Sequence, residues 1–160
     1  MSSMTHRVAI RPATPSDVGA IARCVCGAYL RYIERIGRQP WPMLQDYSSV
    51  IRTSQVHVAE REEHIVGVLE LLITDRGFLL DSVAVDPSAQ GTGVGRSLLQ
   101  FAEAEAKRQG FESIYLMTNE KMTENQELYA RIGYVLLDRQ TVHGYSRVLM
   151  RKLLNGAHAA

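Results

Sequence analysis

The sequence predicts a single domain of the mixed α/β class, in which a central sheet carries helices on its faces. The chain has 160 residues, a length typical of one domain. Hydrophobic residues make up 46% and charged residues 22%, the balance of a chain that buries a core and is not disordered. Strand and helix patterns follow one another in the order β, α, α, three strands, α, β, α, β, β, which predicts a mixed sheet.

The N-terminal part is expected to hold one short strand and two helical segments. Val8-Ala9-Ile10 is an apolar run that Pro12 stops, which predicts a short strand. Ser16 or Asp17 is expected to cap a helix that runs toward Tyr29. The next helical segment is expected to give way to an irregular loop, because two prolines interrupt it.

Three strands are expected next. Residues 55–60 and 64–74 are rich in Val and Ile and flank Arg61-Glu62-Glu63, which predicts a hairpin. A third apolar run, residues 78–85, ends at Asp86-Pro87.

The second half of the chain predicts two further helices with strands between and after them. Val94, Leu98 and Ala102 recur at helical spacing, and Gly110 stands where a C-cap is expected. Residues 113–118 predict a strand.

Thr123-x-x-Gln126 has the spacing of a capping box, so we expect a helix that begins there and ends at Gly133. Residues 134–137 and 145–153 close the chain as two more strands.

Charge and cysteine content exclude several classes of protein. Eighteen basic and seventeen acidic side chains give a net charge of +1, which argues against a general nucleic-acid or membrane-surface binder. Cys24 and Cys26 are the only cysteines, which suits a reducing compartment, and the five histidines lack metal-ligand spacing. No signal peptide or membrane span is recognised. We expect a cytoplasmic protein without a metal, with its domain at residues 7–154 and flexible ends at 1–6 and 155–160.

The strongest chemical signal is the segment Val83-Ala84-Val85-Asp86-Pro87-Ser88-Ala89-Gln90-Gly91-Thr92-Gly93-Val94-Gly95-Arg96, a strand that leads through a glycine-rich turn into a helix. Glycines allow the main chain to turn sharply and to approach a ligand closely. The free N–H groups and the positive dipole end of the helix favour a phosphate there. The segment therefore predicts a phosphate or pyrophosphate site, and a loop that only reverses the chain is the alternative.

Two common nucleotide motifs do not fit this segment. The dinucleotide fingerprint requires a glycine where Arg96 stands. The P-loop requires a lysine where Arg96 stands and a glycine where Gln90 stands.

The segment resembles the central motif of the GNAT superfamily of N-acetyltransferases, Gln/Arg-x-x-Gly-x-Gly/Ala, which is Gln90-Gly91-Thr92-Gly93-Val94-Gly95 here. Val83-Ala84-Val85-Asp86-Pro87 precedes it as in the family, and Thr118-Asn119-Glu120, Asn125, Tyr129 and Gly133-Tyr134 follow at the expected distance. The resemblance covers residues 8–154 and extends to a bacterial branch of small members. It implies a mostly antiparallel sheet of six to seven strands flanked by helices.

The resemblance implies that acetyl-CoA is bound as co-substrate. Main-chain N–H groups of residues 91–96 would hold its pyrophosphate, and the main chain of Val83 and Val85 would pair with its pantetheine arm where two strands splay apart. Arg96 would either add charge near a phosphate or be a solvated residue, and Asn119 is equally well explained as a turn residue. The implied cofactor-binding residues are Val83, Val85, Gln90, Gly91, Thr92, Gly93, Val94, Gly95, Arg96, Asn119 and Asn125.

The resemblance also implies the catalytic groups. Asn125 and Tyr129 are four residues apart, so they share one helix face. In the family, the asparagine contacts the pantetheine and the tyrosine protonates the leaving thiolate, and a phenol with a pKa of about 10 suits that role. A packed tyrosine is the alternative for Tyr129. Asp81 and Glu70 interrupt apolar runs and are the candidate general bases, with Asp81 preferred, although each could instead face solvent.

We therefore expect direct transfer of an acetyl group to a primary amine of a small molecule or peptide, within a ternary complex. A non-catalytic acyl-CoA-binding sensor or regulatory module is the alternative. A homodimer through the closing strands is left open, and no nucleic-acid or membrane partner is expected.

Overall fold

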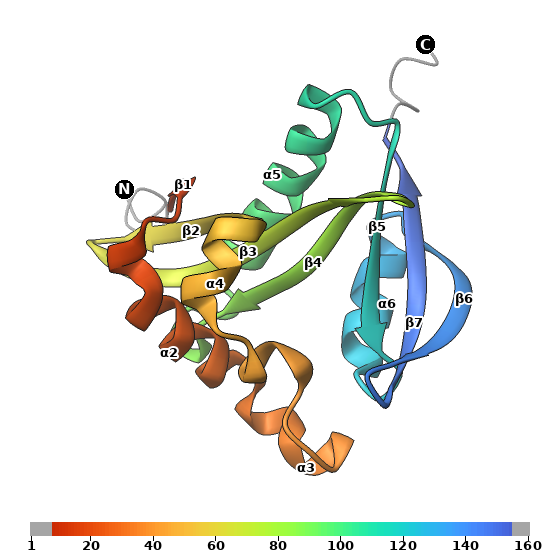
Figure 1. Ribbon diagram of the computed structural model, residues 1–160, viewed down its shortest axis with the longest axis horizontal. Helices are drawn as coiled ribbons and strands as arrows, with labels where there is room; N and C mark the ends of the chain where they lie inside the picture. Colours follow the sequence, from red (N-terminus) through yellow and green to blue (C-terminus); the bar gives the residue numbers. More distant parts are fainter. Residues whose placement is uncertain (1–7, 155–160) are drawn as a thin grey trace. The chain divides into compact units, whose positions relative to one another are not determined.

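Seven strands form one sheet in the computed structural model, which describes residues 8–154. The strands are β1 (Ala9–Pro12), β2 (Gln55–Arg61), β3 (His64–Thr74), β4 (Gly77–Val85), β5 (Ser113–Asn119), β6 (Val135–Val142) and β7 (Tyr145–Leu153). Their order in the sheet is β1-β2-β3-β4-β5-β7-β6 (Figure 1). The expected flexible ends, 1–6 and 155–160, lie outside the described residues, and the domain limits at 7 and 154 stay a prediction.

The sheet is mixed and mostly antiparallel. β4 and β5 run parallel, whereas β1–β2, β2–β3, β5–β7 and β6–β7 are antiparallel pairs. A parallel pair requires a long crossover, and here the crossover contains the 15-residue helix that follows β4. The predicted mixed sheet of six to seven strands is confirmed.

Five α-helices and four short 3₁₀ segments connect the strands in the described part of the chain. They are η1 (Pro15–Asp17), α2 (Val18–Tyr29), η2 (Leu30–Tyr32), α3 (Ile33–Ile36), η3 (Trp41–Leu44), α4 (Tyr47–Thr53), η4 (Pro87–Ala89), α5 (Val94–Arg108) and α6 (Thr123–Arg131). The predicted elements are all present, although β6 is longer than the predicted strand and Pro12, which was expected to stop the first strand, is the last residue of β1.

The chain divides into two compact units. The first comprises the described residues up to Leu71 together with Ser82–Ala102. In it, α2 and α4 cover one face of β2 and β3 (Figure 1), and their apolar side chains share one buried cluster. Ile21 of α2 and Val58 and Val68 of the strands are fully buried in it. Burial of one such side chain contributes about 1.5–3 kcal/mol, which holds these elements together.

The second unit comprises Leu72–Asp81 and the described residues from Glu103 onward. In its sheet, Leu79, Tyr115 and Leu149 form a buried cluster on one face. The Lys152 ammonium lies 2.9 Å from the Glu103 carboxylate, which ties β7 to the C-terminal part of α5.

Two helices begin differently from what the sequence led us to expect. The helix α4 was not predicted, and its N-cap Asp46 accepts a hydrogen bond from the Ser48 amide at 3.1 Å. The predicted capping box is wrong, because the N-cap of α6 is Met122 and no side chain caps it. The Gln126 amide instead donates to the Glu120 carbonyl at 2.9 Å, since it reaches back over the preceding turn.

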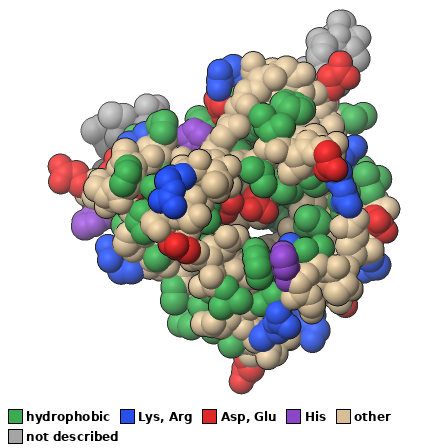
Figure 2. Space-filling model, in the orientation of Figure 1, with side chains coloured by type: hydrophobic (Ala, Val, Ile, Leu, Met, Phe, Trp, Pro, Cys, Tyr) green, Lys and Arg blue, Asp and Glu red, His purple; other side chains and the backbone are tan. Residues whose placement is uncertain are grey.

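The surface carries charges of both signs. On the face drawn in Figure 2, Lys and Arg side chains are interspersed with Asp and Glu side chains. Within residues 8–154, no helix combines the length and the apolarity that a membrane crossing requires.

Candidate functional site

The loop between β4 and α5 contains two residues in the left-handed region. Gly91 has φ 80° and Gly93 has φ 94°, conformations that side chains other than glycine rarely adopt. A Cβ atom built on either glycine would meet no atom within 4 Å. Both glycines are therefore required by their backbone conformation and border open space.

This loop holds a group of main-chain donors without an internal acceptor. Among the described residues, the N–H groups of residues 91 and 93–96 donate to no other group. The Thr92 N–H does bond internally, to the Ala89 carbonyl at 3.3 Å, and the Ser97 N–H bonds the Gly93 carbonyl at 3.0 Å. Five free donors at the N-terminus of a 15-residue helix form a suitable site for an anion.

Side-chain hydrogen bonds hold the loop in shape. The Asp86 carboxylate accepts bonds from the Ser88 amide at 2.9 Å and the Ser88 hydroxyl at 2.7 Å. The Thr92 hydroxyl donates to the Ala89 carbonyl at 2.5 Å and accepts from the Arg61 guanidinium at 2.8 Å. Arg61 at the end of β2 thus anchors the loop to the β2–β3 hairpin.

Arg96 is exposed, and within the described range 8–154 its side chain forms no hydrogen bond or ion pair. Both alternatives from the sequence, a charge for a phosphate and a solvated side chain, fit this placement.

One edge of β4 has no partner strand over its last residues. The pairing of β4 with β5 covers only Phe78–Leu80 of β4 and ends there. The Asp86 N–H donates to the Val66 carbonyl of β3 at 2.9 Å. Because main-chain groups alternate along a strand, those of Val83 and Val85 face the opposite edge.

Two side chains of the first unit donate hydrogen bonds to the carbonyls of Val83 and Val85 at this edge. The Tyr29 hydroxyl donates to the Val83 carbonyl at 3.1 Å, and the Gln90 amide donates to the Val85 carbonyl at 3.1 Å. Gln90 was predicted to bind the cofactor, whereas in this structure its side-chain amide binds β4. The bond from Tyr29 was not predicted, and no motif signals it.

Tyr129 and Asn125 lie in the second unit on α6. Tyr129 is 6% exposed, and its ring meets that of Tyr134 edge-on with a centroid distance of 5.7 Å. Asn125 is half-buried one helical turn earlier. The packing stated above as the alternative for Tyr129 is therefore present, and its catalytic role stays a prediction.

Tyr134 carries a buried hydroxyl that was not predicted from the sequence. Within the described part of the chain, this hydroxyl has no hydrogen-bond partner. Burial, together with the nearby Glu103 and Tyr129, raises the pKa of Tyr134 well above its ordinary value. The phenol therefore stays protonated throughout the neutral range.

Asn119 has a structural role at the end of β5. Its side-chain oxygen accepts a hydrogen bond from the Lys121 amide at 2.9 Å. This bond agrees with the alternative that Asn119 is a turn residue. It uses the side-chain oxygen and leaves the side-chain nitrogen of Asn119 outside the turn.

The two candidate carboxylates differ in environment. Glu70 is 3% exposed in the first unit and accepts a hydrogen bond from the Ser54 hydroxyl at 3.0 Å. Asp81 belongs to the second unit and is half-buried on β4. The alternative that Glu70 faces solvent is therefore wrong, because β3 is an interior strand and helices cover the face that carries its side chain.

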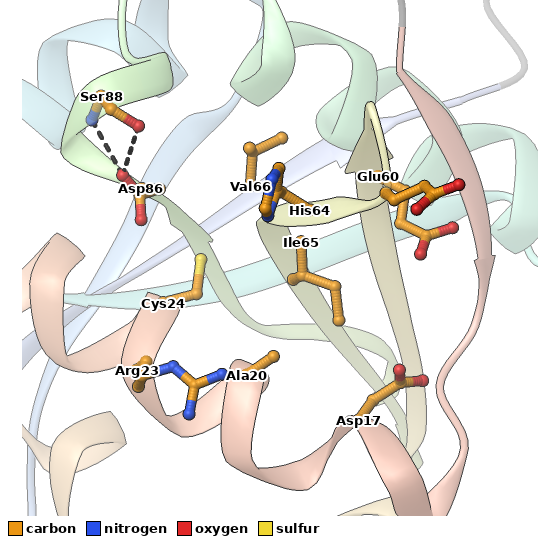
Figure 3. Close-up of a pocket in the computed structure, with 11 residues that line it drawn as sticks. Asp17, Ala20, Arg23, Cys24, Glu60, His64, Ile65, Val66, Asp86 and Ser88 are labelled. Carbon is orange, nitrogen blue, oxygen red and sulfur yellow. Dashed lines mark hydrogen bonds between the residues drawn. The ribbon is translucent and has the colours of Figure 1, made fainter.

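A cavity of about 450 Å³ lies in the first unit beside the loop (Figure 3). Its lining comes from η1, α2, the β2–β3 hairpin, Asp86 and η4, and includes none of the predicted site residues. At one end, the Arg11 guanidinium binds Asp17 at 2.8 Å and Glu60 at 3.1 Å, so two lining carboxylates are already paired. Burial raises the pKa of the Cys24 thiol in this cavity to about 12, which leaves it a poor nucleophile.

Comparisons with known proteins agree with this geometry. A family model described as an acetyltransferase (GNAT) domain matches residues 52–136, more than half of the chain. The PaiA N-acetyltransferase of Thermoplasma acidophilum, solved with coenzyme A, is 16% identical with a TM-score of 0.75, over 91% of this chain and 98% of that one. The ribosomal-protein-S18-alanine N-acetyltransferase of Escherichia coli is 16% identical with a TM-score of 0.72, over 92% and 94%.

A GNAT acetyltransferase of Elizabethkingia anophelis, solved with acetyl-CoA bound, is 18% identical with a TM-score of 0.68, over 92% of this chain and 99% of that one. No curated protein matches the sequence. At these identities the solved structures show the fold, and the family model carries the assignment. Because that model covers the β2–β3 hairpin, β4, the glycine-rich loop and α6, the chain belongs to the GNAT family of acetyltransferases and is an acyltransferase.

Proposed function

We propose that this acetyltransferase moves the acetyl group of acetyl-CoA to a primary amine of a small molecule or peptide. The observation that carries the proposal is the set of five unpaired main-chain donors at the start of α5. The pyrophosphate of coenzyme A is an anion of suitable size for such donors. Family structures solved with coenzyme A or acetyl-CoA share this fold, which supports the same ligand here.

The pyrophosphate would be held by the N–H groups of residues 91 and 93–96, with Arg96 as an added charge. Thr92 would keep its bonds to Ala89 and Arg61 and so maintain the loop shape. The unpaired edge at Val83 and Val85 would hold the amides of the pantetheine arm, and Asn125 would contact the arm from α6.

The transfer itself would be direct. The amine nitrogen attacks the thioester carbonyl, a C–N bond forms, and the C–S bond breaks. Tyr129 donates its proton to the departing thiolate, and a carboxylate takes the proton that the amine loses. Asp81 is the proposed base and Glu70 the alternative. No cysteine is required, which fits the raised pKa of Cys24.

A mixture of acetyl-CoA and a panel of primary amines tests the proposal, with release of free thiol as the readout and coenzyme A binding measured by calorimetry. We expect binding and turnover with at least one amine. Binding without turnover over the whole panel would favour a sensor module, and absence of binding would refute the proposed ligand. We further propose that the protein acts in the cytoplasm, where Cys24 and Cys26 stay reduced.

A further inference from the structure

The hydrogen bond between Tyr29 and Val83 joins two segments that are 54 residues apart in the chain. The Tyr29 hydroxyl donates to the Val83 carbonyl at 3.1 Å. Its ring lies 6.4 Å from the ring of Tyr32, which is buried. Tyr29 therefore comes from a packed helix end, and its hydroxyl is directed to one main-chain oxygen.

That oxygen belongs to the unpaired edge of β4. A free strand edge offers its carbonyls to any N–H donor, including those of another chain. Here the carbonyls of Val83 and Val85 each carry a donor from the chain itself. Gln90 is exposed and unbranched, so it moves aside easily, whereas Tyr29 is half-buried and belongs to α2.

A ligand amide that pairs with β4 as a strand does would approach the Val83 carbonyl from this same edge. The Tyr29 hydroxyl is already hydrogen-bonded to that carbonyl oxygen. The bound arm and the hydroxyl would thus use the same acceptor, the Val83 carbonyl oxygen.

We propose that Tyr29 competes with an amide N–H of the pantetheine arm for the Val83 carbonyl, and so sets the affinity for the arm but not for the nucleotide part of the cofactor. The inference rests on the proposed function. It makes Tyr29 a specificity-determining residue: a ligand gains the Val83 carbonyl only by displacing the tyrosine hydroxyl.

Calorimetric titration of the wild type and of Tyr29→Phe with two probes tests the proposal. The probes are coenzyme A and 3′-phospho-ADP, which has the nucleotide and its phosphates but no arm. Phenylalanine keeps the ring and removes the hydroxyl that donates to the Val83 carbonyl. We expect the Kd for coenzyme A to fall about 3- to 10-fold, the range that one net hydrogen bond supplies, and the Kd for 3′-phospho-ADP to stay unchanged.

Tyr47→Phe is the matched control. The Tyr47 hydroxyl also donates to a main-chain carbonyl of the first unit, that of Pro42 at 2.9 Å, and its removal is expected to leave the Kd for coenzyme A unchanged. Tyr29→Leu is a second variant, expected to shift the Kd in the same direction, and thermal unfolding of each variant checks the fold.

An unchanged or higher Kd for coenzyme A in Tyr29→Phe would overturn the inference, as would an equal fall for both probes. Failure of the wild type to bind coenzyme A would overturn the proposed function instead, so the two failures are distinguishable.

Discussion

The rings of Tyr129 and Tyr134 meet edge-on, with their planes inclined by 63°. Tyr129 is the proposed acid, and the Tyr134 hydroxyl has no hydrogen-bond partner in the described residues. This pair makes it possible to separate the chemical role of one phenol from the packing role of the other.

Tyr134→Phe is expected to stabilise the protein. An unsatisfied buried hydroxyl costs about 1–3 kcal/mol, and phenylalanine keeps the ring contact. Urea unfolding measures the difference. Tyr115→Phe is the contrasting variant, because the Tyr115 hydroxyl is hydrogen-bonded to the Thr74 hydroxyl, and it is expected to lose about 1 kcal/mol. A loss of stability in Tyr134→Phe would contradict the prediction.

Tyr129→Phe is expected to lower kcat by about 100-fold or more, because the thiolate would depart without a proton donor. The affinity for coenzyme A should change little. Steady-state kinetics with a responsive amine and calorimetry with coenzyme A give both values. Tyr134→Phe is the control for loss of a neighbouring hydroxyl, and equal effects of the two variants on kcat would argue against Tyr129 as the acid.

Asp81→Asn is expected to lower kcat by about 100-fold at neutral pH if Asp81 takes the proton of the amine. Glu70→Gln should retain the bond with the Ser54 hydroxyl and change kcat by no more than about twofold. The pH dependence of kcat distinguishes a lost base from a distorted site. The opposite ranking of these two variants would assign the base to Glu70.

Gly93→Ala is expected to weaken coenzyme A binding by about tenfold, because the left-handed conformation of residue 93 aligns the free donors. Gly110→Ala controls for backbone strain alone. Gly110 has φ 92° and, like Gly93, no atom within 4 Å of a built Cβ. Both variants should lose similar stability in urea unfolding. Equal effects on affinity would remove the loop from the binding site.

Asp17→Asn is expected to destabilise the protein in a pH-dependent manner. The hydrogen bond from Arg11 lowers the pKa of Asp17 to about 2. The unfolded carboxylate titrates near pH 3.9, so its stabilisation, about 2 kcal/mol, is complete well above pH 4 and is lost as the pH falls toward 2. At pH 7 the free energy of unfolding of Asp17→Asn should be clearly lower than that of the wild type. At pH 2 the two values should be almost equal. A constant difference would contradict the assignment to this ion pair.

The elements with a regular pattern were predictable from the sequence. The β2–β3 hairpin follows from Val and Ile runs on both sides of a polar turn, and α5 follows from apolar residues at helical spacing. The helix α4 escaped prediction because it has seven residues with two serines among them, too few to show a period. Its one signal is Asp46 two residues before Ser48, an N-cap pattern.

The site was predictable where its chemistry is local. Positive φ at Gly91 and Gly93 and the free donors follow from a glycine-rich strand-to-helix turn. The bond from Tyr29 to Val83, the buried hydroxyl of Tyr134 and the tether from Arg61 depend on tertiary packing between distant segments. Sequence spacing carries no information about such contacts, so only the folded chain reveals them.

The link from Arg61 to Thr92 has a kinetic consequence. A turn that is already frozen by its own bonds loses little conformational entropy when an anion arrives. Capture should then be fast, limited by encounter and not by rearrangement, and the turn should stay protected from amide hydrogen exchange at Thr92 even in the unliganded enzyme. Loss of the hydrogen bond between Arg61 and Thr92 should therefore slow association, although it removes no contact to the ligand itself.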